Sequence, residues 1–212
     1  MFKSVAPGSK AVPRIVDHAQ RREQLAQLAV GLIQRRGAER ATVRGIARAG
    51  GFSVGVLNHY FRSKDQLLAF TFEWLAQQTF TELDRTLAVT PPGLARVRAA
   101  LEFMVPSAAA PSFIAIWVGL WSGATRNPAL ARIHRGYYTR WRRRLRLLLR
   151  EAVRRGEIAA PPSLPLAVDL LTAGIDGFWI GGSFEPRRFA GRRRRALVAA
   201  LMKAVLSARS GR

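Results

Sequence analysis

The chain has 212 residues, no cysteine and a formal net charge of +22 at pH 7. This length allows one or two domains with ordinary hydrophobic cores, and the lack of cysteine excludes disulfide bonds and thiolate metal sites. So large a positive charge favours nucleic acid, an anionic membrane or an acidic ligand as partner, and charge alone does not choose among them. Arginine supplies most of the charge, and the base composition of the genome explains that bias equally well.

Two stretches bear on cellular location. The first eighteen residues contain Lys3, Lys10 and Arg14 but no apolar run of the length a secretory signal needs, so a cytoplasmic protein is expected. The most apolar stretch, residues 164–182, is about long enough to cross a bilayer, yet it carries Asp169 and Asp176 on one helical face. We therefore predict a buried helix there and no membrane partner.

Apolar residues recur every three to four positions along most of the chain, which predicts an all-α fold of about nine helices. After a basic, flexible tail at residues 1–18, the first helix is expected over residues 19–36, with Gly37 as its C-cap. Thr42 is expected to cap a second helix, which the Gly50-Gly51 pair ends.

Two closely spaced caps follow. Ser53 is expected to cap a third helix that ends near Phe61, and Ser63 with Gln66 has the pattern of a capping box, so a fourth helix starts almost at once. The fourth helix continues to the proline pair at residues 91–92. Further helices are predicted over residues 94–109, 112–124, 127–155, 166–181 and 189–207.

The three short helices within residues 19–64, with Gly-Gly-Phe-Ser between the second and third, have the pattern of a helix-turn-helix. Leu57 and Phe61, with Tyr60 in part, form the face that packs on the first two helices. The opposite face is small or polar, as entry into a major groove about 12 Å wide requires. The alternative is that residues 42–68 form a corner of a helical core with no nucleic-acid role.

The segment TVRGIARAGGFSVGVLNHYFRSKDQLL, residues 42–68, resembles the DNA-binding segment of TetR-family repressors. Its Asn-His-Tyr-Phe tetrad is most similar to the choline-responsive BetI branch, as is the Arg-Arg-x-Gln-Leu motif that opens the first helix. Later stretches with the same resemblance are Trp117 to Trp121, Asn127-Pro128 and Ile175 to Trp179. The resemblance covers residues 19–182 and implies a ligand-responsive transcriptional regulator, in this case a repressor.

The resemblance also implies which residues contact DNA. The positions that match the family's base and phosphate contacts are Thr42, Arg44, Ser53, Val54, Gly55, Asn58, His59, Tyr60 and Lys64. Two positions depart from the pattern. Gly45 stands where a polar helix former is more usual, which should weaken the second helix by up to about 1 kcal/mol relative to alanine. Asn58 replaces a frequent tyrosine, which leaves the operator sequence open.

A second candidate site lies among the aromatic residues of the C-terminal part. Trp117 and Trp121 share a helical face, and Trp179 follows Asp176 by one helical turn on another helix. If the two faces converge, the indole rings and the carboxylate form a cage for a cationic effector such as a choline-like quaternary ammonium ion. The alternative is that the tryptophans are ordinary core residues and that Asp176 has a structural partner.

Other motifs predict little chemistry. The three histidines are scattered, no glycine-rich phosphate loop is present, and no nucleophile can be paired with a base, so we predict neither an enzyme nor a metal site or cofactor. Arginine runs at residues 140–146 and 192–195 suggest a second nucleic-acid site. However, Trp141 and Leu145 continue an apolar stripe, so these arginines are interpreted as a solvated face whose further role is open.

The predicted architecture is therefore a DNA-binding domain at residues 19–64 followed by a ligand-binding and dimerisation domain at residues 65–212. The resemblance implies a homodimer formed by the last two helices, and the apolar run at residues 170–178 supports this because it leaves no water-facing side. A dimer implies double-stranded operator DNA with a near-palindromic sequence. The alternatives are a basic architectural or RNA-binding protein that does not read sequence, and a helical enzyme.

Overall fold

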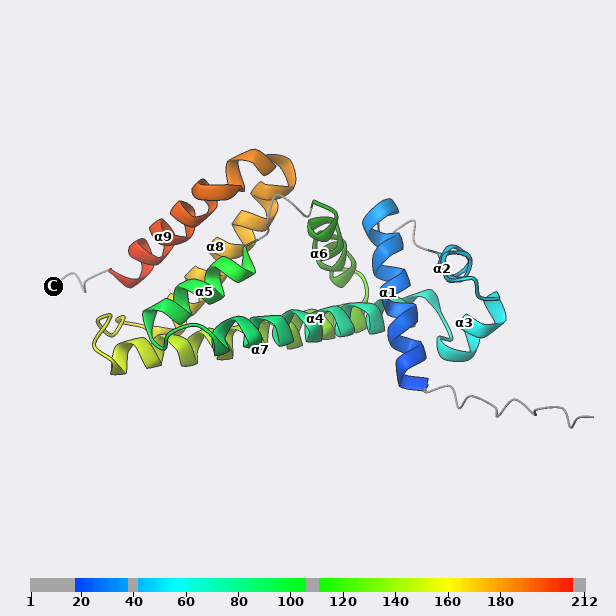
Figure 1. The fold of residues 1–212 in the computed structure, drawn as a ribbon, viewed down its shortest axis with the longest axis horizontal. Helices are drawn as coiled ribbons and strands as arrows, with labels where there is room; N and C mark the ends of the chain where they lie inside the picture. The colour runs from blue at the N-terminus through cyan, green and yellow to red at the C-terminus, as the bar shows by residue number, and fades with distance from the viewer. Residues whose placement is uncertain (1–17, 38–41, 106–110, 208–212) are drawn as a thin grey trace, which may run out of the picture.

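The computed structural model describes residues 18–37, 42–105 and 111–207, and every regular element within these ranges is a helix (Figure 1). The elements are α1 (His18–Arg36), α2 (Val43–Gly50), α3 (Val54–Tyr60), α4 (Lys64–Ala88), α5 (Leu94–Met104), α6 (Pro111–Ala124), α7 (Pro128–Arg154), α8 (Leu164–Phe184), the 3₁₀ helix η1 (Pro186–Phe189) and α9 (Gly191–Leu206).

The helix ends follow the predicted caps. Thr42, Ser53 and Ser63 each accept a hydrogen bond from the backbone N–H three residues later, at 3.0, 3.2 and 3.1 Å. Gly37 and Gly51 adopt positive φ angles of 78° and 68° directly after α1 and α2, a conformation that glycine reaches without steric cost. Residues 1–17 of the predicted tail lie outside the described residues, and His18 already belongs to α1.

Several predicted boundaries shift. Helix α8 begins at Leu164, two residues early, because Ser163 caps it by accepting from Leu166 N–H. The last predicted helix divides into η1 and α9, with Ala190 in extended conformation between them. Helix α5 ends at Met104 because Val105 is extended, and the remainder of its predicted range, residues 106–109, lies outside the described residues.

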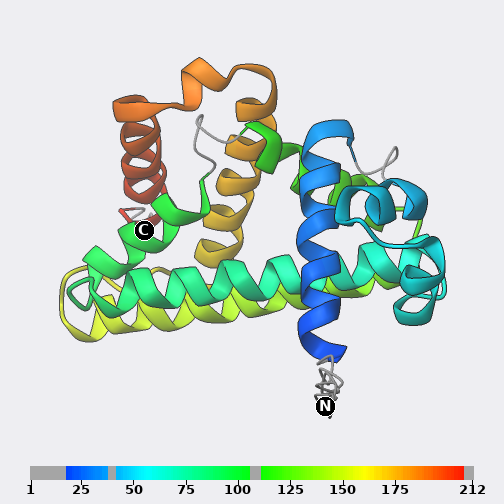
Figure 2. The ribbon, with the colours of Figure 1, turned by 45° about the vertical axis from the view of Figure 1, so that its right-hand side comes forward.

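Two hydrophobic clusters divide the molecule, and α4 belongs to both. Leu67 and Phe72, in its first half, pack with α1, α2, α3 and α6, whereas Phe80 and Leu83, in its second half, pack with α5, α7, α8 and α9. Helices α4 and α7 lie side by side along the length of the molecule, with α1 to α3 at one end (Figures 1 and 2). Helix α4 therefore connects the two ends as one continuous rod.

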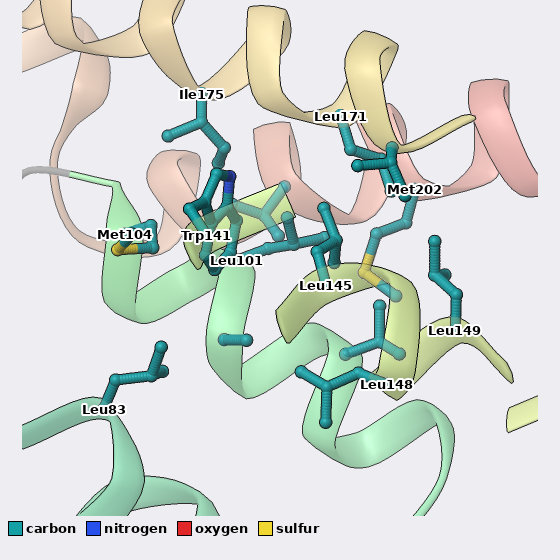
Figure 3. Packing of buried hydrophobic residues seen from close by; sticks show 14 of the residues in the cluster. Leu83, Leu101, Met104, Trp141, Leu145, Leu148, Leu149, Leu171, Ile175 and Met202 are labelled. Carbon is teal, nitrogen blue, oxygen red and sulfur yellow. The ribbon is translucent and has the colours of Figure 1, made fainter. Parts of the chain in front are cut away.

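Helix α7 supplies the centre of the larger cluster. Its buried side chains Trp141, Leu145, Leu148 and Leu149 point toward α5, α8 and α9, where they meet residues such as Met104 and Met202 (Figure 3). Because these residues all lie on one side of α7, the arginines between them are directed away from the core.

Candidate DNA-binding surface and effector pocket

Helix α3 is attached to the domain by one side only. Leu57 and Phe61 are 0% and 1% exposed, and both pack in the cluster with residues of α1 and α2. Tyr60 is half-buried and packs at the edge of that cluster. The predicted contact residues on the other side, Ser53, Val54, Gly55, Asn58 and His59, are all exposed. The structure thus brings them together on one face of α3.

The turn before α3 is shaped by close packing. A Cβ atom on Gly50 would lie 2.4 Å from Leu28 Cδ1 and 2.7 Å from the Phe52 ring, so a larger residue does not fit without movement. Close packing also explains why position 45 is glycine, because a Cβ atom there would lie 3.1 Å from both Leu32 Cδ2 and Thr42 Oγ1. The departure from the family pattern at Gly45 therefore brings α2 close to α1.

The start of α4 is fixed immediately after α3. Ser63 accepts from Gln66 N–H at 3.1 Å, and Gln66 Oε1 accepts from the backbone N–H of Arg62 at 2.7 Å. The return bond thus reaches one residue further back than the capping box predicted from the sequence. These bonds hold Lys64 as the first residue of α4, next to the exposed face of α3.

His59 also takes part in a cluster of three rings. Its ring centroid lies 5.7 Å from that of His18 and 5.2 Å from that of Tyr60, and His18 lies 5.4 Å from Tyr60. The first residue of α1 therefore packs beside the end of α3. The sequence pattern did not indicate this contact, because forty residues separate the two histidines.

A basic hollow adjoins the predicted contacts at the start of α2. It has a volume of about 430 Å³, and its lining includes the predicted residues Thr42 and Arg44 together with Arg35 and Arg48. Sequence reasoning missed Arg35 and Arg48, because neither matches a family contact position and only folding places α1 and α2 next to each other. Three guanidinium groups at one hollow suit a phosphate group.

The four predicted effector residues line one small cavity. Trp117 and Trp121 of α6 face Trp179 of α8, with ring centroids 6.4 and 6.2 Å apart. Asp176 lies on the same side of α8, and all four residues border a narrow space of about 20 Å³. This is room for about one water molecule, so the pocket is closed in this structure.

Sequence reasoning missed the other walls of this cavity. Met104, Tyr137, Tyr138, Trp141 and Ile175 complete its lining. Tyr137 stacks on Trp117 with centroids 4.7 Å apart, and Trp179 donates from Nε1 to the Met104 carbonyl oxygen at 2.7 Å. The sequence shows two adjacent tyrosines, which could have been considered as further aromatic residues of the pocket. Only the packing of α7 between α6 and α8 shows that both side chains reach it.

Asp176 is the one acidic residue among the described residues that line the cavity. Tyr138 donates a 2.7 Å hydrogen bond to Asp176 Oδ1. Burial raises the pKa of Asp176, and the Tyr138 hydrogen bond and the nearby Arg142 charge oppose that shift without cancelling it. Burial and the bond to Asp176 raise the pKa of Tyr138, which therefore stays protonated. The pocket thus combines aromatic faces with one carboxyl group that a cation would help to ionise.

His134 stacks on the outer side of Tyr138, with ring centroids 4.4 Å apart. Burial lowers the pKa of His134, and the charges of Arg142 and Arg135 lower it further. The imidazole is therefore neutral near pH 7 and adds no positive charge beside the pocket.

The pocket and the DNA-binding end share a helix. Trp117, with Ile116 and Leu120, belongs to the hydrophobic cluster that also contains Leu25 of α1 and Leu57 of α3. Helix α6 contacts both α1 and α8, and Figure 1 shows it between them. A movement of Trp117 therefore changes packing in the core that supports α3.

Family comparisons agree with this arrangement. Residues 93–207 match the family described as BetI-type transcriptional repressor, C-terminal, and residues 25–69 match bacterial regulatory proteins of the tetR family. The HTH-type transcriptional regulator BetI of Vibrio vulnificus is 26% identical over 190 residues, which cover 88% of this chain and 93% of that protein. The regulator PksA of Bacillus subtilis is 41% identical over 78 residues, 37% of this chain and 38% of its own length.

Solved structures show the same fold. A transcriptional regulator from Pseudomonas aeruginosa PAO1 matches with a TM-score of 0.77 and 26% identity, over 92% of this chain and 94% of that one. A regulator from Saccharomonospora viridis, solved in complex with choline, matches with a TM-score of 0.79 and 20% identity, over 87% of this chain and 96% of that one. The chain therefore belongs to the TetR family of transcriptional regulators, with a C-terminal domain of the BetI type.

Proposed function

We propose that this regulator is a cytoplasmic repressor that a quaternary ammonium compound, such as choline or betaine aldehyde, releases from its operator. The observation that carries this proposal is the pocket in which four tryptophans and two tyrosines surround the carboxyl group of Asp176. A quaternary ammonium group, which has no N–H donor, is held well by ring faces, and a buried carboxylate compensates its charge. The choline bound to the Saccharomonospora viridis protein makes choline the first compound to try.

The DNA contacts follow from the exposed face of α3. Its small residues Val54 and Gly55 allow close approach to a groove, and Asn58 and His59 supply hydrogen-bonding groups for base edges or phosphates. Thr42, Arg44 and Lys64 lie at helix starts beside it and are proposed to bind the phosphate backbone. Arg35 and Arg48 join them through the basic hollow.

The proposed homodimer rests on an apolar stripe along α8. Leu166, Leu170 and Ile180 are 57%, 48% and 52% exposed, and Ala173, Gly177 and Phe184 continue the same line. Alternating steps of four and three residues place all six on one helical face, the spacing with which helices pack in bundles. This helix is also long and apolar enough to span a membrane. Asp169 and Asp176, which pair with Arg142 and Tyr138, favour the protein partner.

The closed pocket suggests how an effector acts. A ligand of choline's size does not fit in about 20 Å³, so binding must separate α6 from α8. Because Trp117 also packs in the core under α3, that separation shifts the DNA-binding end of the same protomer. The effector then favours the arrangement in which the two copies of α3 no longer match successive major grooves.

Binding is tested by thermal shift and calorimetry with choline, betaine aldehyde and the uncharged carbon analogue of choline, 3,3-dimethylbutan-1-ol. We expect both cations to stabilise the protein and the neutral analogue to bind at least about tenfold more weakly, because a cation at a desolvated aromatic site gains about 2 kcal/mol. Trp121→Leu should remove the preference for the cation. Equal binding of choline and its neutral analogue contradicts the proposed pocket chemistry.

A further inference from the structure

Helix α7 carries an unusually regular row of arginines on its outer side. The helix contains nine arginines and a single acidic residue, Glu151. Six of the arginines recur at steps of three to eight residues on the face opposite Trp141 and Leu145. These six, which we call the α7 arginine row, are Arg132, Arg135, Arg143, Arg146, Arg150 and Arg154. At 3.6 residues per turn they fall within about 100° of the helix circumference.

Three acidic residues on or beside α7 are bound to arginines outside the row. Asp169 pairs with Arg142, at 2.8 Å. Asp84 pairs with Arg144, at 2.7 Å. Glu151 pairs with Arg96 of α5, at 3.5 Å. Among the described residues, no member of the α7 arginine row forms an ion pair, and five of the six are exposed. Arg132 shares a surface hollow with Glu23 and Glu73, and from Arg135 to Arg154 the row is a line of positive charge without described ion pairs.

The dimensions of the row fit duplex DNA. Its ends are separated by 22 helical residues, which corresponds to about 33 Å at 1.5 Å per residue, close to the roughly 34 Å of one duplex turn. A guanidinium group can donate two parallel hydrogen bonds to the oxygens of one phosphate, so a regular row of arginines suits the regular array of backbone phosphates. The position between Arg135 and Arg143 is Thr139, whose hydroxyl can also donate to a phosphate.

The composition of the row argues against other polyanions. A helix that inserts into a lipid surface carries bulky apolar residues beside its charges, and here the edges of the row carry Leu147, 51% exposed, and the half-buried Val153. Single-stranded nucleic acid needs aromatic platforms for its bases, and the row has none. We propose that the α7 arginine row is a second DNA-binding surface, separate from α3, that holds the phosphate backbone of duplex DNA without reading its sequence.

The experiment isolates this surface from α3. In a background with Asn58→Ala, His59→Ala and Lys64→Ala, binding of a 30-base-pair mixed-sequence duplex is measured by fluorescence anisotropy at several salt concentrations. One variant adds Arg135→Gln, Arg143→Gln and Arg150→Gln. The matched control adds Arg187→Gln, Arg192→Gln and Arg193→Gln, which remove the same charge from exposed positions in η1 and α9. Thermal denaturation confirms that each variant folds.

We expect the α7 triple variant to bind the duplex at least about tenfold more weakly than the control. The slope of log affinity against log salt concentration should also decrease in magnitude by about one for each lost phosphate contact. Equal weakening of the two triple variants overturns the proposal, because net charge alone then accounts for the affinity. Equal binding with neither variant weakened also overturns it, because the row then contributes nothing. Binding of the control to phosphatidylglycerol vesicles but not to the duplex would also overturn it.

Discussion

At the residue scale, Asp176 decides the chemistry of the pocket. Its carboxyl group is buried beside Tyr138, and its raised pKa means that the folded protein holds a proton there more tightly than the unfolded chain does. The stabilisation that protonated Asp176 contributes is therefore fully present below the ordinary carboxyl pKa, and it is lost as the pH rises through the raised pKa of the folded protein. A bound cation favours the ionised form and opposes this loss.

The resulting prediction concerns pH. Choline affinity should increase as pH rises through the pKa of Asp176, and Asp176→Asn should weaken binding by about tenfold or more and abolish the pH dependence. The same substitution should flatten the decline of stability across that pH range. Isothermal titration over an acidic-to-neutral series checks the affinity, and thermal denaturation over the same series checks the stability. Asp169→Asn, on the same helix but paired with Arg142 at the surface, is the control and should change neither.

At the element scale, local signals in the sequence were sufficient to predict most of the helices of the fold. Thr42, Ser53 and Ser63 sit at the helix starts they were predicted to cap, because a cap needs only the backbone of the next three residues. The convergence of Trp117 and Trp179 was a hypothesis from spacing, and the structure places both at one cavity. Tyr137 and Tyr138 were not predicted as pocket residues, since their position depends on how α7 packs between distant helices.

The apolar stripe of α8 leads to a prediction about assembly. Leu170→Glu should convert the dimer to monomers over a concentration range where the wild type is dimeric, because two carboxylates would be buried without partners. Each loss of about 1.4 kcal/mol weakens the dimer affinity tenfold. Leu147→Glu, at a similarly exposed leucine on α7, is the matched control and should leave the dimer intact. Light scattering after size-exclusion chromatography gives the masses. A dimeric Leu170→Glu protein would place the interface elsewhere.

At the scale of the whole molecule, the two proposed DNA-binding surfaces would use the charge of +22 for two kinds of binding that differ in specificity. The proposed α3 face presents a small set of groups for base edges, whereas the α7 arginine row can only add sequence-independent affinity. A basic architectural protein would bind all duplexes alike. Membership of the TetR family predicts instead a preference of about a thousandfold or more for the operator over random duplex.

The central claim is that a cation in the aromatic pocket releases the protein from DNA. Its most direct measurement is the affinity of the wild type and of Trp121→Leu for a duplex from the region upstream of the protein's own gene, with and without saturating choline. We predict that choline weakens wild-type binding by about tenfold or more and leaves Trp121→Leu unchanged, since allosteric couplings are typically 1–3 kcal/mol. Choline that binds the wild type while its operator affinity stays the same would contradict the account.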